Sequence, residues 1–265
     1  FIFMFDWGIR GAAIATVSAQ VIALLWQLKQ FNNANELLHF RRGIFRLKRK
    51  IVFDSLAIGM SPFLMNLAAC LIVILINQGL KKYGGDLAIG AFGIVNRLVF
   101  IVVMIVMGLN QGMQPIAGYN FGAKLYDRVN KVLKLTIIYA TCVTTFGFLV
   151  GMLAPNLVVG IFTSDAELTE LSATGLRITV MFFPIIGFQM VTSNFFQSIG
   201  MAGKAIFLSL TRQMLILLPC LLILPHFFGV AGVWYSMPVS DLLASLIALV
   251  MLVYQFRKFK TAAAH

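Results

Sequence analysis

Long apolar runs, separated by short polar connections, make up most of the chain. Seven of these runs are close to the ~20 residues that a helix needs to cross a membrane. They cover residues 9–28, 53–80, 87–117, 134–155, 171–198, 204–225 and 230–255. The pattern predicts an all-α polytopic membrane protein with seven transmembrane helices.

The composition supports the membrane class and excludes several others. Hydrophobic residues form 60% of the 265 positions and charged residues only 11%. The net charge of +12 does not indicate nucleic-acid binding, because the basic residues lie in short loops between apolar runs. Cys70, Cys142 and Cys220 each lie inside an apolar run, so we expect small buried side chains rather than disulfides or a zinc site. The three histidines are scattered, and no enzyme motif occurs, so we expect neither a metal site nor an enzyme.

The connections between runs alternate in charge. Segment 29–50, the loop near 120–134 and the tail 257–265 are rich in lysine and arginine, whereas the loops between them are poorer in cations. By the positive-inside rule the basic connections are cytoplasmic. This places Phe1 outside and the C-terminal tail inside.

The first and last apolar runs resemble each other. When Gly8 is aligned with Gly229, Gly11 falls on Gly232 and Gln20 falls on Asp241. This match predicts a duplicated protein, a common design among transporters, of which this chain is a fragment. We expect the end of one lobe over 1–28, a basic linker over 29–50, a six-helix lobe over 51–256 and a tail over 257–265. Within the linker, residues 39–51 mix aromatic and basic residues, which fits either an amphipathic stretch on the membrane surface or a solvated linker.

Two charges lie deep within the predicted helices. Asp241 is about 11 residues, or ~16 Å, from the outer end of the last helix, and Arg212 reaches a similar depth in the helix before it. We therefore expect Arg212 and Asp241 to approach each other, either as a functional pair or as a structural lock. The lock is slightly favoured, because a carboxylate held by arginine is a poor proton carrier. Arg97 and Arg177 lie about two turns from the outer ends of their helices, where they can snorkel or line a polar cavity.

The stretch 108–124 combines amides, glycines and Pro115 at the end of an apolar run. It fits either a discontinuous helix at a substrate site or the bent end of a structural helix. Other amides lie inside apolar helices and can line a cavity or bond between helices. The candidate cavity residues are Asn66, Asn110, Gln111, Gln114, Gln189, Asn194 and Gln197.

Several separate motifs occur in one order along the second half of the chain. They are GLNQGMQPIAGYNFGA (108–123), FTSD (162–165), FQSIG (196–200), SLTRQ (209–213), GVW (232–234) and PVSD (238–241). Together they resemble the MATE (multidrug and toxic compound extrusion) family across residues 50–256, and the start of the chain resembles the end of the family's first lobe. The resemblance implies twelve helices in two six-helix lobes around a central cavity, in the bacterial plasma (inner) membrane. It further implies export of small amphipathic, mostly cationic compounds by Na⁺ or H⁺ antiport, with no cofactor other than the coupling ion. The expected partners are these substrates, the lipid bilayer and the other lobe.

The resemblance also gives Thr16 a role. In members with a cation site in the N-terminal lobe, the threonine of this GAAxAT motif helps to bind the cation, together with acidic and amide residues that lie upstream of Phe1 in the family. Another subfamily uses carboxylates in the first and fourth helices of the C-terminal lobe. Here those helices carry only Asp54 and Glu170, at their ends, so the resemblance favours an N-lobe coupling site.

Two other functions stay open. A lipid-linked oligosaccharide flippase of the same superfamily would need cationic side chains to bind a pyrophosphate group. Arg97, Arg177 and Arg212 are compatible with that alternative. A chain with half a cavity could also be a non-transporting membrane scaffold or a truncated product.

Overall fold

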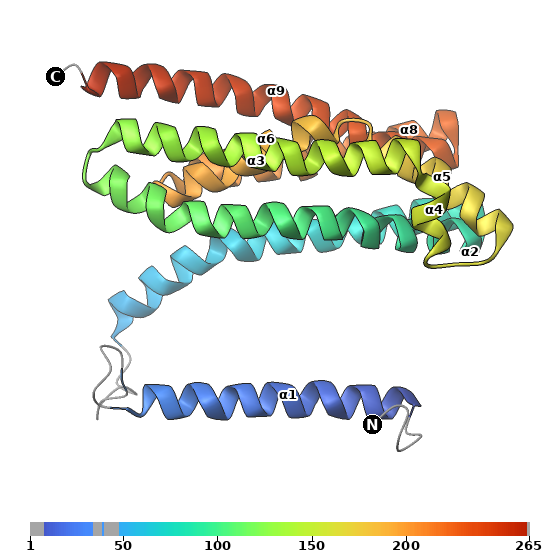
Figure 1. Cartoon of the computed structure of the whole chain (residues 1–265), viewed down its shortest axis with the longest axis horizontal. Helices are drawn as coiled ribbons and strands as arrows, with labels where there is room; N and C mark the ends of the chain where they lie inside the picture. Colours follow the sequence, from blue (N-terminus) through green and yellow to red (C-terminus); the bar gives the residue numbers. More distant parts are fainter. Residues whose placement is uncertain (1–7, 34–38, 40–47, 264–265) are drawn as a thin grey trace. The chain divides into compact units, whose positions relative to one another are not determined.

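The computed structural model describes residues 8–33, 39 and 48–263, and every regular element in these parts is a helix (Figure 1). The prediction of an all-α protein is therefore confirmed for the described residues. The chain divides into two compact units, residues 1–58 and 59–265.

The first unit contains α1 (Gly8–Phe31) and the first turns of α2 (Arg49–Gly122). With 24 residues, α1 spans ~36 Å at 1.5 Å per residue, enough to cross a bilayer. It covers the predicted helix 9–28 and extends it by three residues at its C-terminal end. Most of the predicted amphipathic stretch 39–51 lies outside the described residues.

In the second unit, α2 consists of two helices joined at Gly85. This glycine has φ 68° and ψ −163°, a conformation that glycine adopts readily and other residues rarely do. The parts before and after Gly85 run in opposite directions in Figure 1. They correspond to the separate helices predicted over 53–80 and 87–117.

The predicted helix 171–198 is broken in the structure. It consists of α5 (Ala166–Val180) and α6 (Phe183–Ser198), which meet at an angle of 55°. Pro184 accounts for the break, because its ring excludes the carbonyl four residues earlier, which belongs to Val180, the last residue of α5. Before this pair lie α3 (Tyr126–Leu153) and α4 (Pro155–Gly160).

The predicted helix 204–225 is continuous but contains a wider segment. It comprises α7 (Ala202–Leu210), the π-helix η1 (Thr211–Leu217) and α8 (Leu218–Phe228). Pro219 cannot donate to a carbonyl in the preceding turn, and the wide turns of η1 come directly before it. Gly229, with φ 57°, then reverses the chain into α9 (Val230–Ala263).

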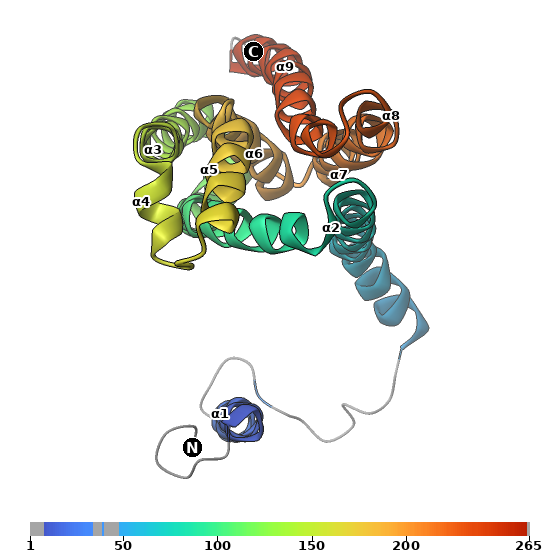
Figure 2. The same ribbon diagram turned by 90° about the vertical axis from the view of Figure 1, so that its right-hand side faces the viewer.

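Among the described residues, five helices are long and apolar enough to cross a membrane, and the bent pair α5–α6 makes a sixth candidate. In the second unit α3 packs on α6 and α8 packs on α9 (Figure 2). Two groups of buried side chains fill this bundle, one around Phe92, Phe183 and Trp234 and one around Phe195 and Phe196.

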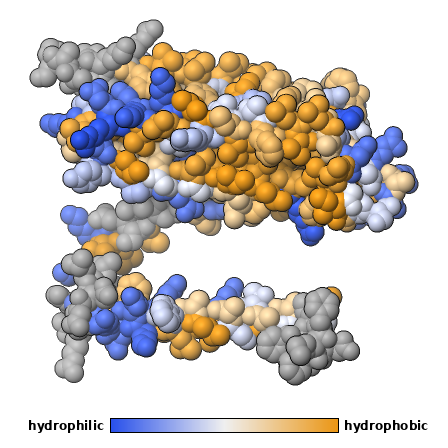
Figure 3. Space-filling view, in the orientation of Figure 1, coloured by the Kyte–Doolittle hydropathy of each residue, from blue (hydrophilic) through white to orange (hydrophobic). Residues whose placement is uncertain are grey.

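The surface of the second unit carries an apolar band with hydrophilic groups towards both ends (Figure 3). Large side chains such as Phe146 and Val250 are each 69% exposed. A surface of this kind suits lipid rather than water. Cys70 and Cys142 also lie on the surface, so their predicted burial is wrong: they occupy outward faces of their helices, while Cys220 is half-buried.

Candidate functional site

The structure brings Arg212 and Asp241 together. Nε of Arg212 donates a hydrogen bond to Oδ1 of Asp241 over 2.7 Å. The Asp241 side chain is 5% exposed and that of Arg212 33% exposed, so the carboxylate is the more deeply buried partner. A buried carboxylate needs such a partner, because an unpaired charge is costly in an apolar interior.

The local backbone positions both charges. Arg212 lies in the second position of η1, and η1 packs directly against α9, which carries Asp241. Ser245 donates to the backbone carbonyl of Asp241 over 2.6 Å, and Ser240 donates to that of Met237 over 2.7 Å. These bonds satisfy hydroxyl groups that would otherwise be buried without partners.

A cavity of about 230 Å³ lies beside the ion pair. Its polar lining consists of Arg212 and Asp241 with Asn96, Thr144, Thr179 and Ser240, and its other walls are apolar. The Thr144 and Thr179 hydroxyls donate to the carbonyls of Ala140 and Gly175 in their own helices. The cavity has room for several waters or a small polar group, and the ion pair is its strongest electrostatic feature.

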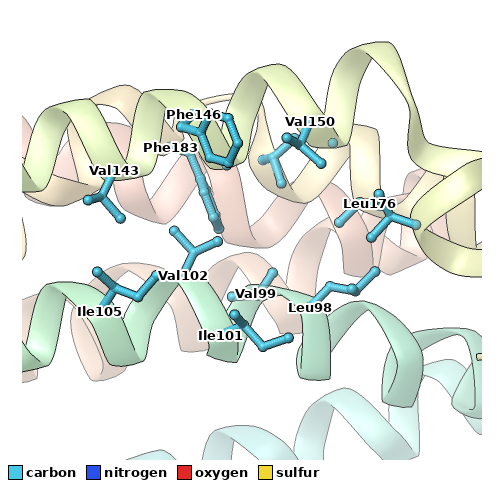
Figure 4. Close-up of a pocket in the computed structure, with 14 residues that line it drawn as sticks. Leu98, Val99, Ile101, Val102, Ile105, Val143, Phe146, Val150, Leu176 and Phe183 are labelled. Atoms are coloured by element: carbon cyan, nitrogen blue, oxygen red, sulfur yellow. The ribbon is translucent and has the colours of Figure 1, made fainter. Parts of the chain in front are cut away.

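A second cavity, of about 210 Å³, lies between the second part of α2, α3 and the α5–α6 pair (Figure 4). Its lining is apolar. Val99, Val102 and Phe183 line both cavities, so these three side chains form a thin wall between them. Phe183 is the first residue of α6, directly after the break from α5.

Of the seven candidate amides, two meet across helices. Nε2 of Gln114 donates to Oδ1 of Asn194 over 3.4 Å, and Nδ2 of Asn194 donates to the Met190 carbonyl over 3.0 Å. Asn110 is 2% exposed, and neither of its amide atoms has a hydrogen-bond partner within the described structure. Gln189 is buried, whereas Asn66, Gln111 and Gln197 are exposed. In the described part of the chain, none of the seven lines either cavity.

The stretch 108–122 is continuous helix, so the interpretation of a discontinuous helix there is wrong. Pro115 is accommodated within α2, and the only non-helical backbone in α2 is at Gly85. The irregular backbone of the site lies instead at the α5–α6 break and in η1. Pro184 and Pro219 mark these two places in the sequence. Nothing in the sequence distinguishes the cavity residues Asn96, Thr144 and Thr179.

The remaining candidate residues have exposed side chains. Arg97 and Arg177 are exposed on the surface of the second unit. Thr16 is exposed on α1, in the first unit, and donates to the Ala12 carbonyl over 3.0 Å. Among the described residues no group of His, Cys, Asp or Glu is arranged to hold a metal ion.

Broken membrane helices around a cavity with charged side chains are a common feature of secondary transporters. The profile of the MatE family matches residues 57–223, and the chain belongs to this family.

Curated relatives and solved structures agree with this assignment. The chain is 28% identical over 260 residues to the multidrug export protein MepA of Staphylococcus aureus, a match that covers 97% of this chain and 56% of that protein. It is 25% identical over 256 residues to MepA of Staphylococcus saprophyticus, with the same coverage. The structure of the MATE multidrug transporter DinF-BH, solved as a ligand complex, superposes with a TM-score of 0.83 and 36% identity, over 98% of this chain and 58% of that one. An outward-facing MATE family transporter gives a TM-score of 0.84 at 21% identity, over 98% of this chain and 59% of that one. The chain thus spans a little over half the length of the proteins it matches.

Proposed function

We propose that this chain forms the C-terminal lobe, and the last helix of the N-terminal lobe, of a twelve-helix multidrug efflux transporter. The observation that carries the proposal is the cavity beside the Arg212–Asp241 pair, whose walls include α5 and α6, with the break between Val180 and Phe183, and the wide turns of η1. A bundle of this kind can change shape, because its breaks act as joints while the helices stay intact. The relatives are named multidrug export proteins. We propose that the substrates here are small amphipathic, mostly cationic drugs, exchanged for Na⁺ or H⁺.

Efflux from membrane vesicles tests this function. Vesicles that contain this chain joined to an N-terminal lobe should expel rhodamine 6G when an inward Na⁺ or H⁺ gradient is imposed. Vesicles with the chain alone should not, because half of the proposed cavity is missing. If the joined protein also fails to move the dye, the result favours a non-transporting membrane scaffold. If anionic lipid carriers inhibit the efflux, the result favours the flippase.

Thr16 is the proposed contribution of this chain to ion coupling. Thr16→Val removes the hydroxyl with little change in size, so we expect coupled efflux of rhodamine 6G to fall at least about tenfold, the equivalent of one lost ligand of ~1.4 kcal/mol. Thr16→Ser keeps the hydroxyl and should retain activity. Ser18→Ala, on the same helix and also exposed, is the matched control. Normal efflux by the Thr16→Val variant would remove this residue from the coupling site.

The proposed topology has seven crossings. The candidate span Phe63–Gly122 contains 60 residues, which at ~1.5 Å per residue is about three times the ~30 Å apolar core of a bilayer. The two parts on either side of Gly85 therefore each cross once. With α1, α3, the α5–α6 pair, α7–α8 and α9, this makes seven, with the N-terminal end outside and the C-terminal end inside.

Labelling with a membrane-impermeant maleimide tests this topology in a background without native cysteines. Lys82→Cys, beside the Gly85 turn, should react from outside intact cells, and Lys131→Cys, on the first turns of α3, should react only after permeabilisation. Both positions are exposed, so access depends on the side of the membrane. Labelling of both from outside, or of Lys131→Cys alone, would contradict the proposed crossings.

A further inference from the structure

The apolar cavity opens on the surface of the bundle. Ile101 is 56% exposed, Ile105 52% and Phe146 69%, so these lining side chains form a rim rather than a closed lid (Figure 4). The lining has no hydrogen-bonding side chain, whereas the neighbouring cavity, which we call the charged cavity, contains Arg212 and Asp241. The apolar cavity therefore suits an apolar group, and the charged cavity suits a polar one.

The two cavities share a wall that depends on Phe183. Val99, Val102 and Phe183 line both cavities, and Phe183 is 3% exposed. Phe183 directly follows the break between α5 and α6. A Cβ added at Gly147 would lie 3.6 Å from Cδ2 of Phe183, so with glycine at this position no side chain restricts the ring from that side. Rotation of this one ring would connect the two cavities.

The volumes decide what each arrangement can hold. The apolar cavity measures about 210 Å³ and the charged cavity about 230 Å³. Pockets for drug-sized molecules have volumes of roughly 300–1,000 Å³, so neither cavity alone holds such a molecule. The connected cavities exceed the lower limit, and they form a single pocket that is apolar at one end and polar at the other.

The polar end is rich in hydrogen-bond acceptors. The hydroxyls of Thr144, Thr179 and Ser240 all donate to backbone carbonyls in their own helices, so each can only accept from a ligand. Asp241 accepts from Arg212 through Oδ1, and its second carboxylate oxygen has no hydrogen-bond partner within the described residues. Apart from Arg212 and one amide, the polar lining therefore favours a ligand that carries N–H groups.

We propose that the two cavities are halves of one binding site for an amphipathic amine, connected by rotation of the Phe183 ring. The apolar body of the ligand lies in the apolar cavity, and its amino group donates to Asp241 and the hydroxyls. The site lies wholly in the second unit, so binding needs no contribution from the other lobe, whereas efflux does. The class of ligand rests on the proposed function, and the site itself rests on the shared wall and the two linings.

Binding of ethidium to this chain in nanodiscs tests the proposal. Ethidium is a flat aromatic cation with amino groups, its fluorescence rises in apolar surroundings, and empty nanodiscs give the background. Val150→Phe fills the apolar cavity and Val103→Phe fills the charged cavity, because each residue lines only that one. Each substitution alone should weaken binding about tenfold, since one ligand occupies both cavities.

The shared wall predicts a change in the rate of binding. Phe183→Ala and Val102→Ala each open the wall, so ethidium should associate about tenfold faster in stopped-flow measurements, because binding no longer waits for the ring to rotate. Val102→Ala is the smaller change, and it replaces Phe183→Ala if that variant fails to fold, as judged by gel filtration. An association rate that both variants share with the native chain overturns the role of the ring.

The controls separate one site from two. Val250→Phe adds a ring to a side chain that is 69% exposed on α9 and should bind ethidium as the native chain does. If a filled variant fails to fold, Val143→Phe replaces the first and Val73→Phe the second. Binding that only one of the two fillings weakens overturns the proposal, and so does a native chain that binds no ethidium. A joined protein that binds ethidium with the expected pattern but does not expel rhodamine 6G keeps this site and loses the proposed function.

Discussion

Arg212→Met is expected to lower the free energy of unfolding by about 3 kcal/mol, the cost of leaving a buried charge without its partner. It strands the Asp241 carboxylate, whose side chain is only 5% exposed. Asp241→Asn should cost less, about 1 kcal/mol, because the amide oxygen still accepts from Nε and Arg212, 33% exposed, can turn towards a polar neighbour. The melting temperatures of the two variants in detergent micelles show which of them loses more stability. Arg128→Met, an exposed arginine on α3, is the matched control and should be nearly neutral.

The double variant Arg212→Met with Asp241→Leu separates a structural lock from a functional pair. Replacing a buried ion pair by apolar side chains of similar volume is often neutral or stabilising, so this variant should recover most of the lost stability. If it also restores efflux of rhodamine 6G, the pair is a lock. If it is stable but inactive, the charges take part in transport. An Arg212→Met protein as stable as the native one would contradict the expected cost of the buried charge.

Gly232→Ala is expected to destabilise the protein by about 3 kcal/mol, at the upper end of the usual cost of overpacking. A Cβ at Gly232 would collide with the backbone carbonyl of Leu224, and would lie 2.7 Å from the backbone nitrogen of Pro225. Backbone atoms cannot move aside as the end of a flexible side chain can. The α8–α9 hairpin, which carries η1 and Asp241 on its two arms, would have to separate.

Gly112→Ala is the control for this substitution. It also lies within a helix, but a Cβ there would meet nothing within 4 Å. It should be neutral or stabilise the protein by up to about 1 kcal/mol, because alanine has the higher helix propensity. Equal melting temperatures for the two alanine variants would show that the hairpin adjusts, and that the close approach is not needed for the fold.

The meeting of Arg212 and Asp241 could be predicted from sequence because it depends on depth. Counting residues from the end of an apolar run gives the depth of a charged residue along the membrane normal. Arg212 and Asp241 have opposite charges and similar predicted depths near the middle of the membrane. The cavity residues depend instead on the direction in which a side chain points around its helix. That direction is hard to read in helices that are apolar on all sides, since little amphipathic contrast marks the buried face. Thr144 is buried beside the cavity, whereas Gln111 and Gln197 are exposed, although all three lie in similar surroundings in the sequence.

The positions of the helix breaks show a second limit. Pro115, Pro184 and Pro219 all lie inside apolar runs, yet α2 passes Pro115 without interruption, α5 ends four residues before Pro184, and π turns precede Pro219. Proline removes one hydrogen bond in each case, but neighbouring helices decide whether the backbone bends, widens or continues. Those neighbours are brought together by the fold and not by the local sequence.

The wide turns of η1 also set the angular relation between the two ends of their helix. A π segment contains one residue more than an α-helix of nearly the same rise, and each residue of an α-helix corresponds to a rotation of about 100°. Side chains before and after η1 can therefore face directions that an uninterrupted helix would not allow. Arg212 turns to Asp241 on α9 while Leu217 and Leu221, farther along, stay buried in the core around Trp234. The extra residue of η1 thus allows the α7–η1–α8 helix to present Arg212 to Asp241 near its middle and Leu217 and Leu221 to the apolar core towards its end.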